Sequence, residues 1–263
     1  MVSVLQASGI TTRLGNKLVL SNLNLPELNT GEVSALMGPN GCGKSTLLKS
    51  LAGLVNCQAR TLTYDGKPLA QSTPNEPSPL VGYLPQNLPE GPNLTVLEAL
   101  LVALTNTAQS VSKQTRLRHA ELILEQLGIL ALAQARADRL SGGQKQLLAL
   151  GQLLCRNPRI LLLDEPFSAL DMAHTYAAMN LLKTITQQRQ LITIFVTHDL
   201  NFALHNANSV LLMHNGQLNH AGPPASVLSP SRIAEIFGVM ARVEYCSRGN
   251  PFIFIDGPAK NSL

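Results

Sequence analysis

The sequence predicts an α/β fold with a mainly parallel sheet, an N-terminal antiparallel β subdomain and an inserted α-helical subdomain. Short apolar segments alternate with helical segments through the C-terminal half of the chain, and fully apolar strands are typical of a parallel sheet that helices cover on both faces. Residues 94–136 contain no strand pattern, which indicates a helical insertion. Residues 61–64 alternate and precede Asp65-Gly66, a turn that closes β-hairpins.

The chain is expected to form one domain over 1–263, with its core at 1–93 and 137–263 and the helical part at about 94–136. Strands are expected at 2–10, 17–20, 32–37, 61–64, 81–84, 160–163, 191–196 and 210–213. Helices are expected at 44–54, 95–104, 113–127, 144–155, 172–188 and 200–206. The tail predicts a hairpin at 214–217, a helix near 231–237 and strands near 241–246 and 252–255.

Composition narrows the class of protein. Apolar residues make up 45% of the 263 residues, so a large core can form, and the net charge is only +4. Basic residues are scattered, which argues against nucleic acid as a partner. No apolar run approaches the ~20 residues that span a bilayer, and the N-terminus lacks the pattern of a signal peptide. The spacing of Cys42, Cys57, Cys155 and Cys246 fits neither disulfides nor a metal site, as expected in a reducing cytosol.

Residues 38–46 match the phosphate-binding pattern Gly-x-x-x-x-Gly-Lys-[Ser/Thr]. The segment follows an apolar strand and opens a helix, so backbone N–H groups and the positive end of the helix would face one anion. Lys44 would reach the β- and γ-phosphates, and the Ser45 hydroxyl would bind Mg²⁺. The alternative is a glycine-rich turn with a chance Lys-Ser, against which both flanks argue. The sequence therefore predicts a P-loop NTPase core that binds a nucleoside triphosphate.

A pair of carboxylates follows the apolar strand at 160–163. Transfer of a phosphoryl group to water needs one acid that holds Mg²⁺ and another that accepts the proton of the attacking water. Asp164 suits the first role and Glu165 the second. The alternative is an Asp-Glu-Pro sequence that only opens a helix.

Residues 140–144, Leu-Ser-Gly-Gly-Gln, place a serine and two glycines at the start of a predicted helix, which makes a second pocket for an anion. Taken alone, the segment could equally be a helix cap. A chain with two phosphate-binding pockets is explained if residues 140–144 of one copy close over a nucleotide bound to residues 38–46 of another copy of the same chain.

Together these motifs resemble the nucleotide-binding subunit of ABC transporters over essentially the whole chain. They stand in a fixed order: 38–46, Leu-Pro-Gln at 84–86, 140–144, Leu-Leu-Leu-Asp-Glu-Pro at 161–166, Ser-Ala-Leu-Asp at 168–171 and Val-Thr-His-Asp at 196–199. The resemblance implies a homodimer packed head to tail, with ATP and Mg²⁺ between each 38–46 loop and the opposing 140–144 segment. It also implies transmembrane permease subunits, indirectly a substrate-binding protein, and a peripheral position on the cytoplasmic face of the inner membrane.

The resemblance also implies roles for individual residues. Catalytic roles fall to Lys44, Gln86, Glu165 and His198, although a lone histidine at a strand end is usually structural. Metal binding falls to Ser45, Gln86 and Asp164. Contacts to the nucleotide fall to Gly38, Pro39, Asn40, Gly41, Cys42, Gly43, Lys44, Ser45, Thr46, Leu14, Ser141, Gly142, Gly143, Gln144 and Asp171.

Two positions invite separate expectations. The family usually carries an aromatic residue where this sequence has Leu14. Stacking of a base on an aromatic ring is worth ~1–3 kcal/mol, so we expect this protein to discriminate less well between nucleotide bases. The alternative is that the Arg13 guanidinium stacks on the base instead. Cys42 lies at a helix start beside Lys44, which predicts a lowered thiol pKa. Its alkylation is then expected to block hydrolysis unless MgATP protects it.

The type of transporter is suggested by weaker signals. Leu-Asp-Met-Ala-His at 170–174 and the segment 221–230 resemble the branch of importers for iron-siderophores, haem and vitamin B12. An importer of another metal ion or small solute is the alternative. A DNA-repair ATPase would need a long coiled coil between 46 and 140, and a translation-associated protein would need two cassettes; this sequence has neither.

Overall fold

The computed structural model describes residues 3–69, 78–89, 93–105 and 112–259. The strands are β1 (Val4–Ser8), β2 (Ile10–Leu14), β3 (Lys17–Leu23), β4 (Leu28–Asn29), β5 (Val33–Met37), β6 (Cys57–Gln58), β7 (Thr61–Tyr64), β8 (Lys67–Pro68), β9 (Val81–Leu84), β10 (Ile160–Leu163), β11 (Ile192–Val196), β12 (Ser209–His214), β13 (Gln217–Gly222), β14 (Val239–Tyr245) and β15 (Pro251–Pro258). The helices are α1 (Lys44–Leu51), α2 (Val96–Thr105), α3 (Lys113–Gln126), η1 (Leu130–Leu132), η2 (Ala137–Arg139), α4 (Gly142–Cys155), α5 (Met172–Gln188), α6 (Leu200–Asn206), α7 (Pro224–Val227) and α8 (Pro230–Phe237).

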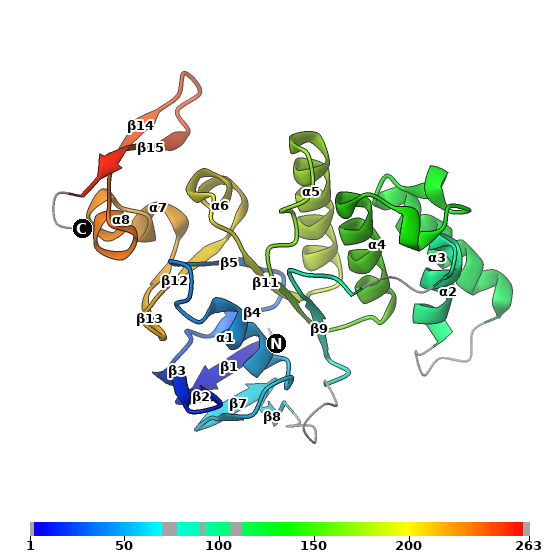
Figure 1. Cartoon of the computed structure of the whole chain (residues 1–263), viewed down its shortest axis with the longest axis horizontal. Coiled ribbons are helices and arrows are strands. Elements are labelled where there is room, and N and C mark those ends of the chain that lie inside the picture. The colour runs from blue at the N-terminus through cyan, green and yellow to red at the C-terminus, as the bar shows by residue number, and fades with distance from the viewer. Residues whose placement is uncertain (1–2, 70–77, 90–92, 106–111, 260–263) are drawn as a thin grey trace.

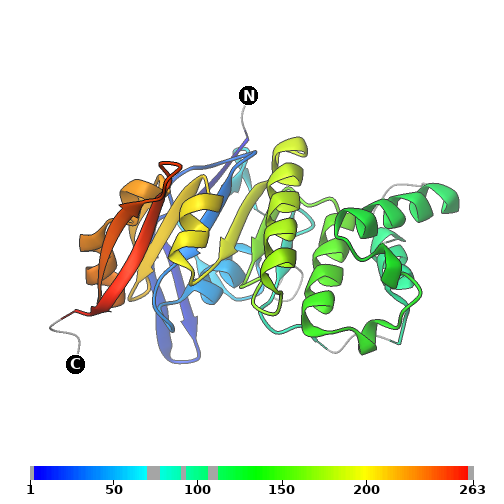
Figure 2. The same cartoon turned by 90° about the horizontal axis from the view of Figure 1, so that it is seen from above.

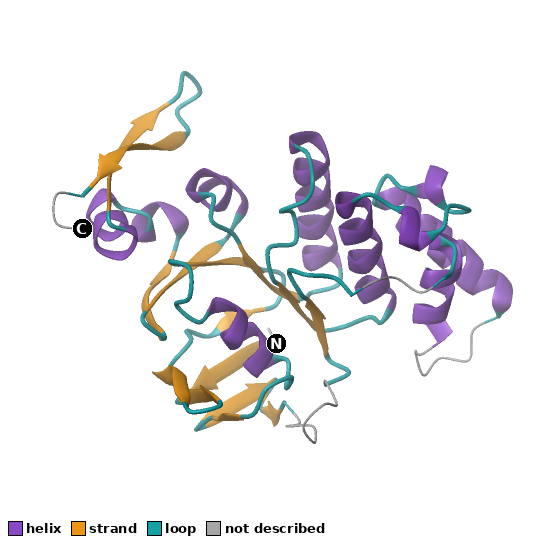
Figure 3. Ribbon diagram, viewed as in Figure 1, coloured by secondary structure: helices purple, strands orange, loops and turns teal. Residues whose placement is uncertain are grey.

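A six-stranded sheet with the order β13-β12-β5-β11-β10-β9 forms the centre of the molecule (Figure 3). All neighbours in it pair in parallel except β12 and β13. Alternate residues of one strand enter different cores: Leu161 and Leu163 pack with the helices α2–α6, whereas Ile160 and Leu162 pack with α1 and the N-terminal strands. Because both faces are covered, the strands read as continuous apolar runs, as the sequence predicted.

Antiparallel strands from the N-terminal part cover the face of the sheet that carries α1 (Figure 1). They form a four-stranded sheet, β4-β1-β7-β8, and a three-stranded sheet, β3-β2-β6. The predicted turn at Asp65-Gly66 joins β7 to β8, with positive φ angles of 53° and 71° at the two residues. This part of the predicted fold is confirmed.

A helical part occupies one end of the elongated molecule (Figure 2). A capping box opens α2, as its predicted start at residue 95 allows: the Thr95 N–H donates to Glu98 Oε2 at 2.8 Å, and the Glu98 N–H donates to Thr95 Oγ1 at 3.2 Å. Helix α3 ends before Gly128, as expected. Helix α4, predicted as part of the core, packs against both α2 and α3. The boundaries at 94 and 136 stay a prediction, and residues 90–92 beside the first lie outside the described residues.

The opposite end carries α7, α8 and a two-stranded hairpin, β14–β15 (Figure 1). Strand β14 lies against α8, and Asn201 of α6 bonds the backbone of Ile253 in β15 through both its amide atoms. The predicted hairpin at 214–217 joins β12 to β13.

Several predicted boundaries are wrong. The single strand expected at 2–10 is two strands, because Gly9 with a φ of 65° ends β1 and lets β2 leave for another sheet; Val2 lies outside the described residues. Helix α1 ends at Leu51 instead of 54, since Gly53 has a φ of 73°. Helix α4 begins at Gly142, because Ser141 and not a later residue provides its cap.

Gly216 in the β12–β13 turn is predicted to be far less replaceable than Gly66 in the β7–β8 turn. The two residues share a φ near 70° (74° and 71°), so alanine causes similar backbone strain of ~1 kcal/mol at either. A Cβ at Gly216 would lie 2.2 Å from the Val19 carbonyl oxygen, whereas a Cβ at Gly66 meets nothing within 4 Å. Urea unfolding should therefore show Gly216→Ala losing a further ~1–3 kcal/mol of unfolding free energy. Equal losses would show that the turn does not press on β3.

Candidate functional site

The carboxyl ends of four neighbouring strands meet at one edge of the central sheet. Strands β5, β11, β10 and β9 lie side by side in parallel, and each ends within one residue of its neighbour, with Leu36 opposite Val196 and Leu163 opposite both Phe195 and Leu84. The segments that leave these strands carry the predicted site residues. In α/β sheets this edge is where ligands bind.

The phosphate-binding loop leaves β5 and turns directly into α1. Gly43 has a φ of 106° and caps the helix, and Lys44 is only 7% exposed. The Lys44 ammonium donates to the carbonyl oxygens of Gly38 at 2.8 Å and Pro39 at 3.0 Å. The ammonium therefore lies inside the loop, where it could also bind a phosphate. Only glycine can occupy position 38 without a clash, because a Cβ there would come within 2.2 Å of the Met213 carbonyl oxygen.

The β12–β13 turn supports the phosphate-binding loop from behind. The Gly216 N–H donates to the Cys42 carbonyl oxygen at 3.0 Å, and the Ser21 N–H of β3 donates to the Gly216 carbonyl oxygen at 3.3 Å. The sequence predicted this hairpin but not its contact with the loop. A long-range contact of this kind leaves no local pattern in the sequence.

The Glu165 carboxylate lies between two polar side chains from the neighbouring strand ends. Gln86, which follows β9, donates from Nε2 to Glu165 Oε2 at 2.8 Å. The Nε2 of His198, which follows β11, lies 3.0 Å from Glu165 Oε1. The structure thus brings together three of the residues expected to be catalytic, and Glu165 itself has a strained φ of 50°.

Asp164 is buried at the end of β10, with 3% of its surface exposed. Burial raises the pKa of its carboxyl, and the neighbouring Glu165 raises it further, while a hydrogen bond from the Ser45 hydroxyl opposes the shift. The Tyr83 hydroxyl lies 3.5 Å from Asp164 Oδ2, a partner that the sequence did not predict. Burial and Asp164 together raise the pKa of that phenol.

Other predicted contact residues lie apart from this cluster. Ser141 and Gln144 form a capping box on α4: Gln144 N donates to Ser141 Oγ at 3.3 Å, and Ser141 N donates to Gln144 Oε1 at 3.0 Å. This confirms the helix cap that the sequence offered as one interpretation, and a role in binding stays a prediction. Asp171 caps α5 by accepting from the His174 N–H at 2.9 Å, which lowers the pKa of Asp171.

Leu14 lies at the tip of the β2–β3 hairpin with 48% of its surface exposed. The Arg13 guanidinium reaches back to the Asn16 carbonyl oxygen at 3.4 Å. The expected weak discrimination between bases stays a prediction.

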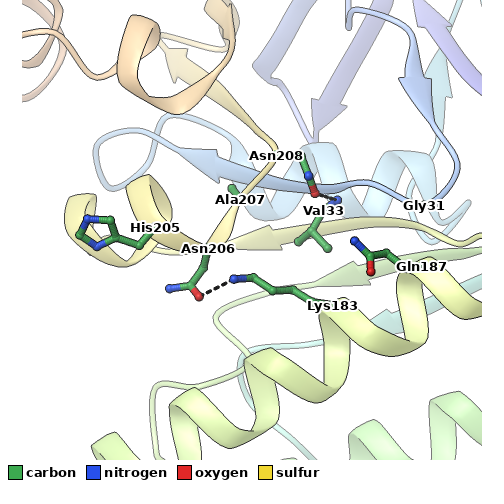
Figure 4. A pocket seen from close by; sticks show the side chains of 8 residues that line it. All are labelled: Gly31, Val33, Lys183, Gln187, His205, Asn206, Ala207 and Asn208. Carbon is green, nitrogen blue, oxygen red and sulfur yellow. Dashed lines mark hydrogen bonds between the residues drawn. The ribbon is translucent and has the colours of Figure 1, made fainter. Parts of the chain in front are cut away.

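A polar hollow of about 220 Å³ lies at the other end of β5 from the phosphate-binding loop (Figure 4). Lys183 Nζ donates to Asn206 Oδ1 at 2.8 Å, and the Val33 N–H donates to Asn208 Oδ1 at 2.9 Å (Figure 4). None of the predicted site residues lines it. Lys183 thus contacts the side chain of Asn206, the last residue of α6.

Among the described residues, no helix is long and apolar enough to span a membrane. The described residues likewise contain no group of three or more His, Cys, Asp or Glu side chains that could hold a metal ion.

Fold and site together define a P-loop nucleoside triphosphatase. The profile of the ABC transporter family matches residues 20–168. The hemin import ATP-binding protein HmuV of Vibrio anguillarum is 34% identical over 246 residues, which cover 92% of this chain and 93% of that protein. This chain belongs to the ABC transporter family and is its ATP-binding, ATP-hydrolysing component.

Two further similarities bear on the type of transporter. The sulfate/thiosulfate import protein CysA of Ralstonia nicotianae is also 34% identical, over 91% of this chain, but the match spans only 64% of that protein. A solved structure assigned to the metal-chelate type of ABC transporter, in an inward-facing conformation, is 25% identical with a TM-score of 0.78 and is covered completely.

The predicted lowering of the Cys42 pKa is wrong. Burial raises the pKa of this thiol, and the charge of Lys44 and the backbone N–H groups offset only part of the effect. The helix start was recognised correctly, but only 7% of the Cys42 surface is exposed, so loss of solvation outweighs the nearby positive charge.

Alkylation of Cys42 near neutral pH is therefore predicted to be slow. Iodoacetamide reacts with the thiolate, and a raised pKa together with burial leaves little accessible thiolate. Exposed Cys246 serves as the internal control, and mass spectrometry of the peptides should show it labelled at least about tenfold faster. Labelling of both at one rate would mean that the loop opens readily in solution.

Proposed function

We propose that this chain powers an importer for haem or a related metal chelate, acting as two identical copies bound to a membrane permease. The main support for this proposal is the position of the Glu165 carboxylate, which lies between Gln86 and His198 beside the phosphate-binding loop. The similarity to HmuV over nearly the full length of both proteins supports the substrate class. The 170–174 segment noted above agrees with it.

An importer of sulfate or another small solute is the second candidate. CysA matches this chain with the same identity of 34% as HmuV does. The haem proposal is preferred because this chain spans 93% of the HmuV protein and only 64% of CysA.

In the proposed reaction, Glu165 accepts the proton of the water that attacks the γ-phosphate. Gln86 and His198 each bond one oxygen of the carboxylate, so they fix its orientation before the nucleotide arrives. Lys44 would exchange its bonds to the Gly38 and Pro39 carbonyl oxygens for the β- and γ-phosphates. The N–H groups of residues 38–46 and the start of α1 would hold the remaining phosphate charge.

The residues around Asp164 fit a magnesium ion. Mg²⁺ prefers hard oxygen ligands and usually takes one or two from the protein and the rest from phosphates and water. Ser45 follows Lys44 in the chain and its hydroxyl helps to stabilise the charged Asp164 carboxylate, so two suitable oxygens lie near each other, and Gln86 approaches the same edge. A bound Mg²⁺ would neutralise charge on the phosphate oxygens, and it would relieve the raised pKa of Asp164.

In the proposed dimer, residues 141–144 of one copy close on the nucleotide held by residues 38–46 of the other, with Asp171 near the interface. Within one copy α4 lies beside the helical part, away from α1 (Figure 1), which supports a nucleotide site that two copies complete. Leu14 would contact the base. Closure of the pair would move the permease, which in turn receives cargo from a substrate-binding protein, at the cytoplasmic face of the membrane.

Glu165→Gln is predicted to abolish most hydrolysis without preventing ATP binding. The amide is nearly isosteric but cannot act as a base, and a positioned base usually contributes ~10²–10⁴-fold to the rate. The measurements are steady-state kcat, ATP affinity, and the mass of the protein with ATP, where the variant should accumulate as a dimer. Glu27→Gln, which alters an exposed carboxylate bonded to Gln6, is the matched control with normal activity. An unchanged kcat in Glu165→Gln would remove this residue from the proposed role.

Growth on defined nutrients tests the substrate. Deletion of the gene should abolish growth on haem as sole iron source and leave growth on sulfate as sole sulfur source intact. The wild-type gene should restore growth and Lys44→Ala should not, because the ammonium that bridges the loop to the phosphates is lost. A defect confined to sulfate would favour the second candidate.

A further inference from the structure

Gln146 is a buried polar residue on a helix face that is otherwise apolar. It lies in α4, shares its side of the helix with Leu150 and Leu153, and is 7% exposed. Its Nε2 donates to Ser168 Oγ at 3.1 Å, and its Oε1 accepts from the Ala169 N–H at 3.2 Å. Both partners belong to the loop that joins Glu165 to α5.

The hydrogen bonds continue from Ser168 to Glu165. The Ser168 hydroxyl donates to the Glu165 carbonyl oxygen at 3.1 Å, and the Ser168 N–H donates to the same oxygen at 3.3 Å. Since the hydroxyl has only one proton, Ser168 Oγ can only accept from Gln146. The opposite orientation of the Gln146 amide would set donor against donor at Ala169, so the network fixes a single arrangement.

The start of α4 also touches this loop directly. A Cβ at Gly143 would lie 2.7 Å from the Ala169 carbonyl oxygen, so only glycine lets the helix and the loop approach this closely. Residues 141–144 are thereby connected to the backbone of Glu165 through the loop at 168–169 within a single copy.

We propose that Gln146 is a positioning residue that links the 141–144 segment to the backbone of Glu165 in the same subunit. The inference rests on the proposed function, in which the 141–144 segment touches the nucleotide of the other copy. When that segment binds the nucleotide held by the other copy, it then positions the Glu165 carboxylate of its own copy, which acts on the second nucleotide. The link acts on the placement of Glu165 and not on the affinity for ATP.

Gln146→Met tests the link, because methionine keeps the size of the side chain and removes both hydrogen bonds. A misplacement of a reacting group by about 1 Å can cost ~10²-fold, so kcat should fall about 10- to 100-fold while ATP affinity changes less than about twofold. Gln152→Met is the matched control, since Gln152 lies on the same helix and bonds the Ala99 carbonyl oxygen of α2 instead of the loop after Glu165; its kcat should stay normal.

Two further variants separate positioning from folding. Gln146→Glu can still accept from the Ala169 N–H but, as a carboxylate, cannot donate to Ser168, so it should lose kcat, with some loss of stability from the buried charge. Ser168→Ala interrupts the same link, and the double variant Gln146→Met/Ser168→Ala should be no slower than the slower single variant.

The proposal is overturned if kcat stays within about twofold in Gln146→Glu and Ser168→Ala, if ATP affinity falls in proportion to kcat, or if the two substitutions act additively. Thermal unfolding of each variant identifies any loss due to instability, and Ser168→Ala, at an exposed position, decides if the Gln146 variants do not fold. Glu165→Gln in the same assay tests the proposed function separately. An unchanged kcat in that variant would show that the proposed function has failed, whatever the result for the Gln146 variants.

Discussion

The alignment of four parallel strands is the constraint on which the site depends. A parallel sheet brings the carboxyl ends of neighbouring strands to one edge, and here β5, β11, β10 and β9 each end within one residue of the neighbouring strand. The loops that leave them are short, so the strand ends determine where Lys44, His198, Glu165 and Gln86 can lie. Burial of the strands on both faces fixes the register, because a shift by one residue would exchange the side chains of the two cores.

The strained backbone of Glu165 shows how this alignment is used. A φ of 50° costs a non-glycine residue roughly 1–2 kcal/mol. Its carbonyl oxygen accepts from the N–H and the hydroxyl of Ser168, and its carboxylate from Gln86, with His198 alongside. With about 1 kcal/mol for each hydrogen bond, these contacts can offset the strain. The conformation is thus maintained by residues from three strand ends and carries its side chain to the sheet edge.

Much of this arrangement could be predicted from local signals. The bounds of α2, α3, α5 and α6 were predicted to within a residue or two, because helix periodicity and the alternation with apolar strands are visible in the sequence. The approach of Gln86 and His198 to one edge follows from strand alternation. What could not be predicted depends on burial and on distant contacts: the pKa of Cys42, the Tyr83 hydroxyl beside Asp164, and the support from Gly216. Gln146 did leave a signal, a polar residue within the apolar stripe of α4, whose meaning becomes clear only when its partners are known.

The cap on α4 bears on how a second copy could use this helix. The first N–H groups of a helix have no partner within it, and Ser141 satisfies the one at Gln144. An anion that docks there would therefore meet the N–H groups of Gly142 and Gly143, already oriented by the reciprocal bond between Ser141 and Gln144. Because Gly143 packs closely on Ala169 and Gln146 bonds the same loop, such docking would act on the loop that carries Glu165. The helix cap and the anion pocket, which the sequence offered as alternatives, are thus compatible as two uses of one rigid segment.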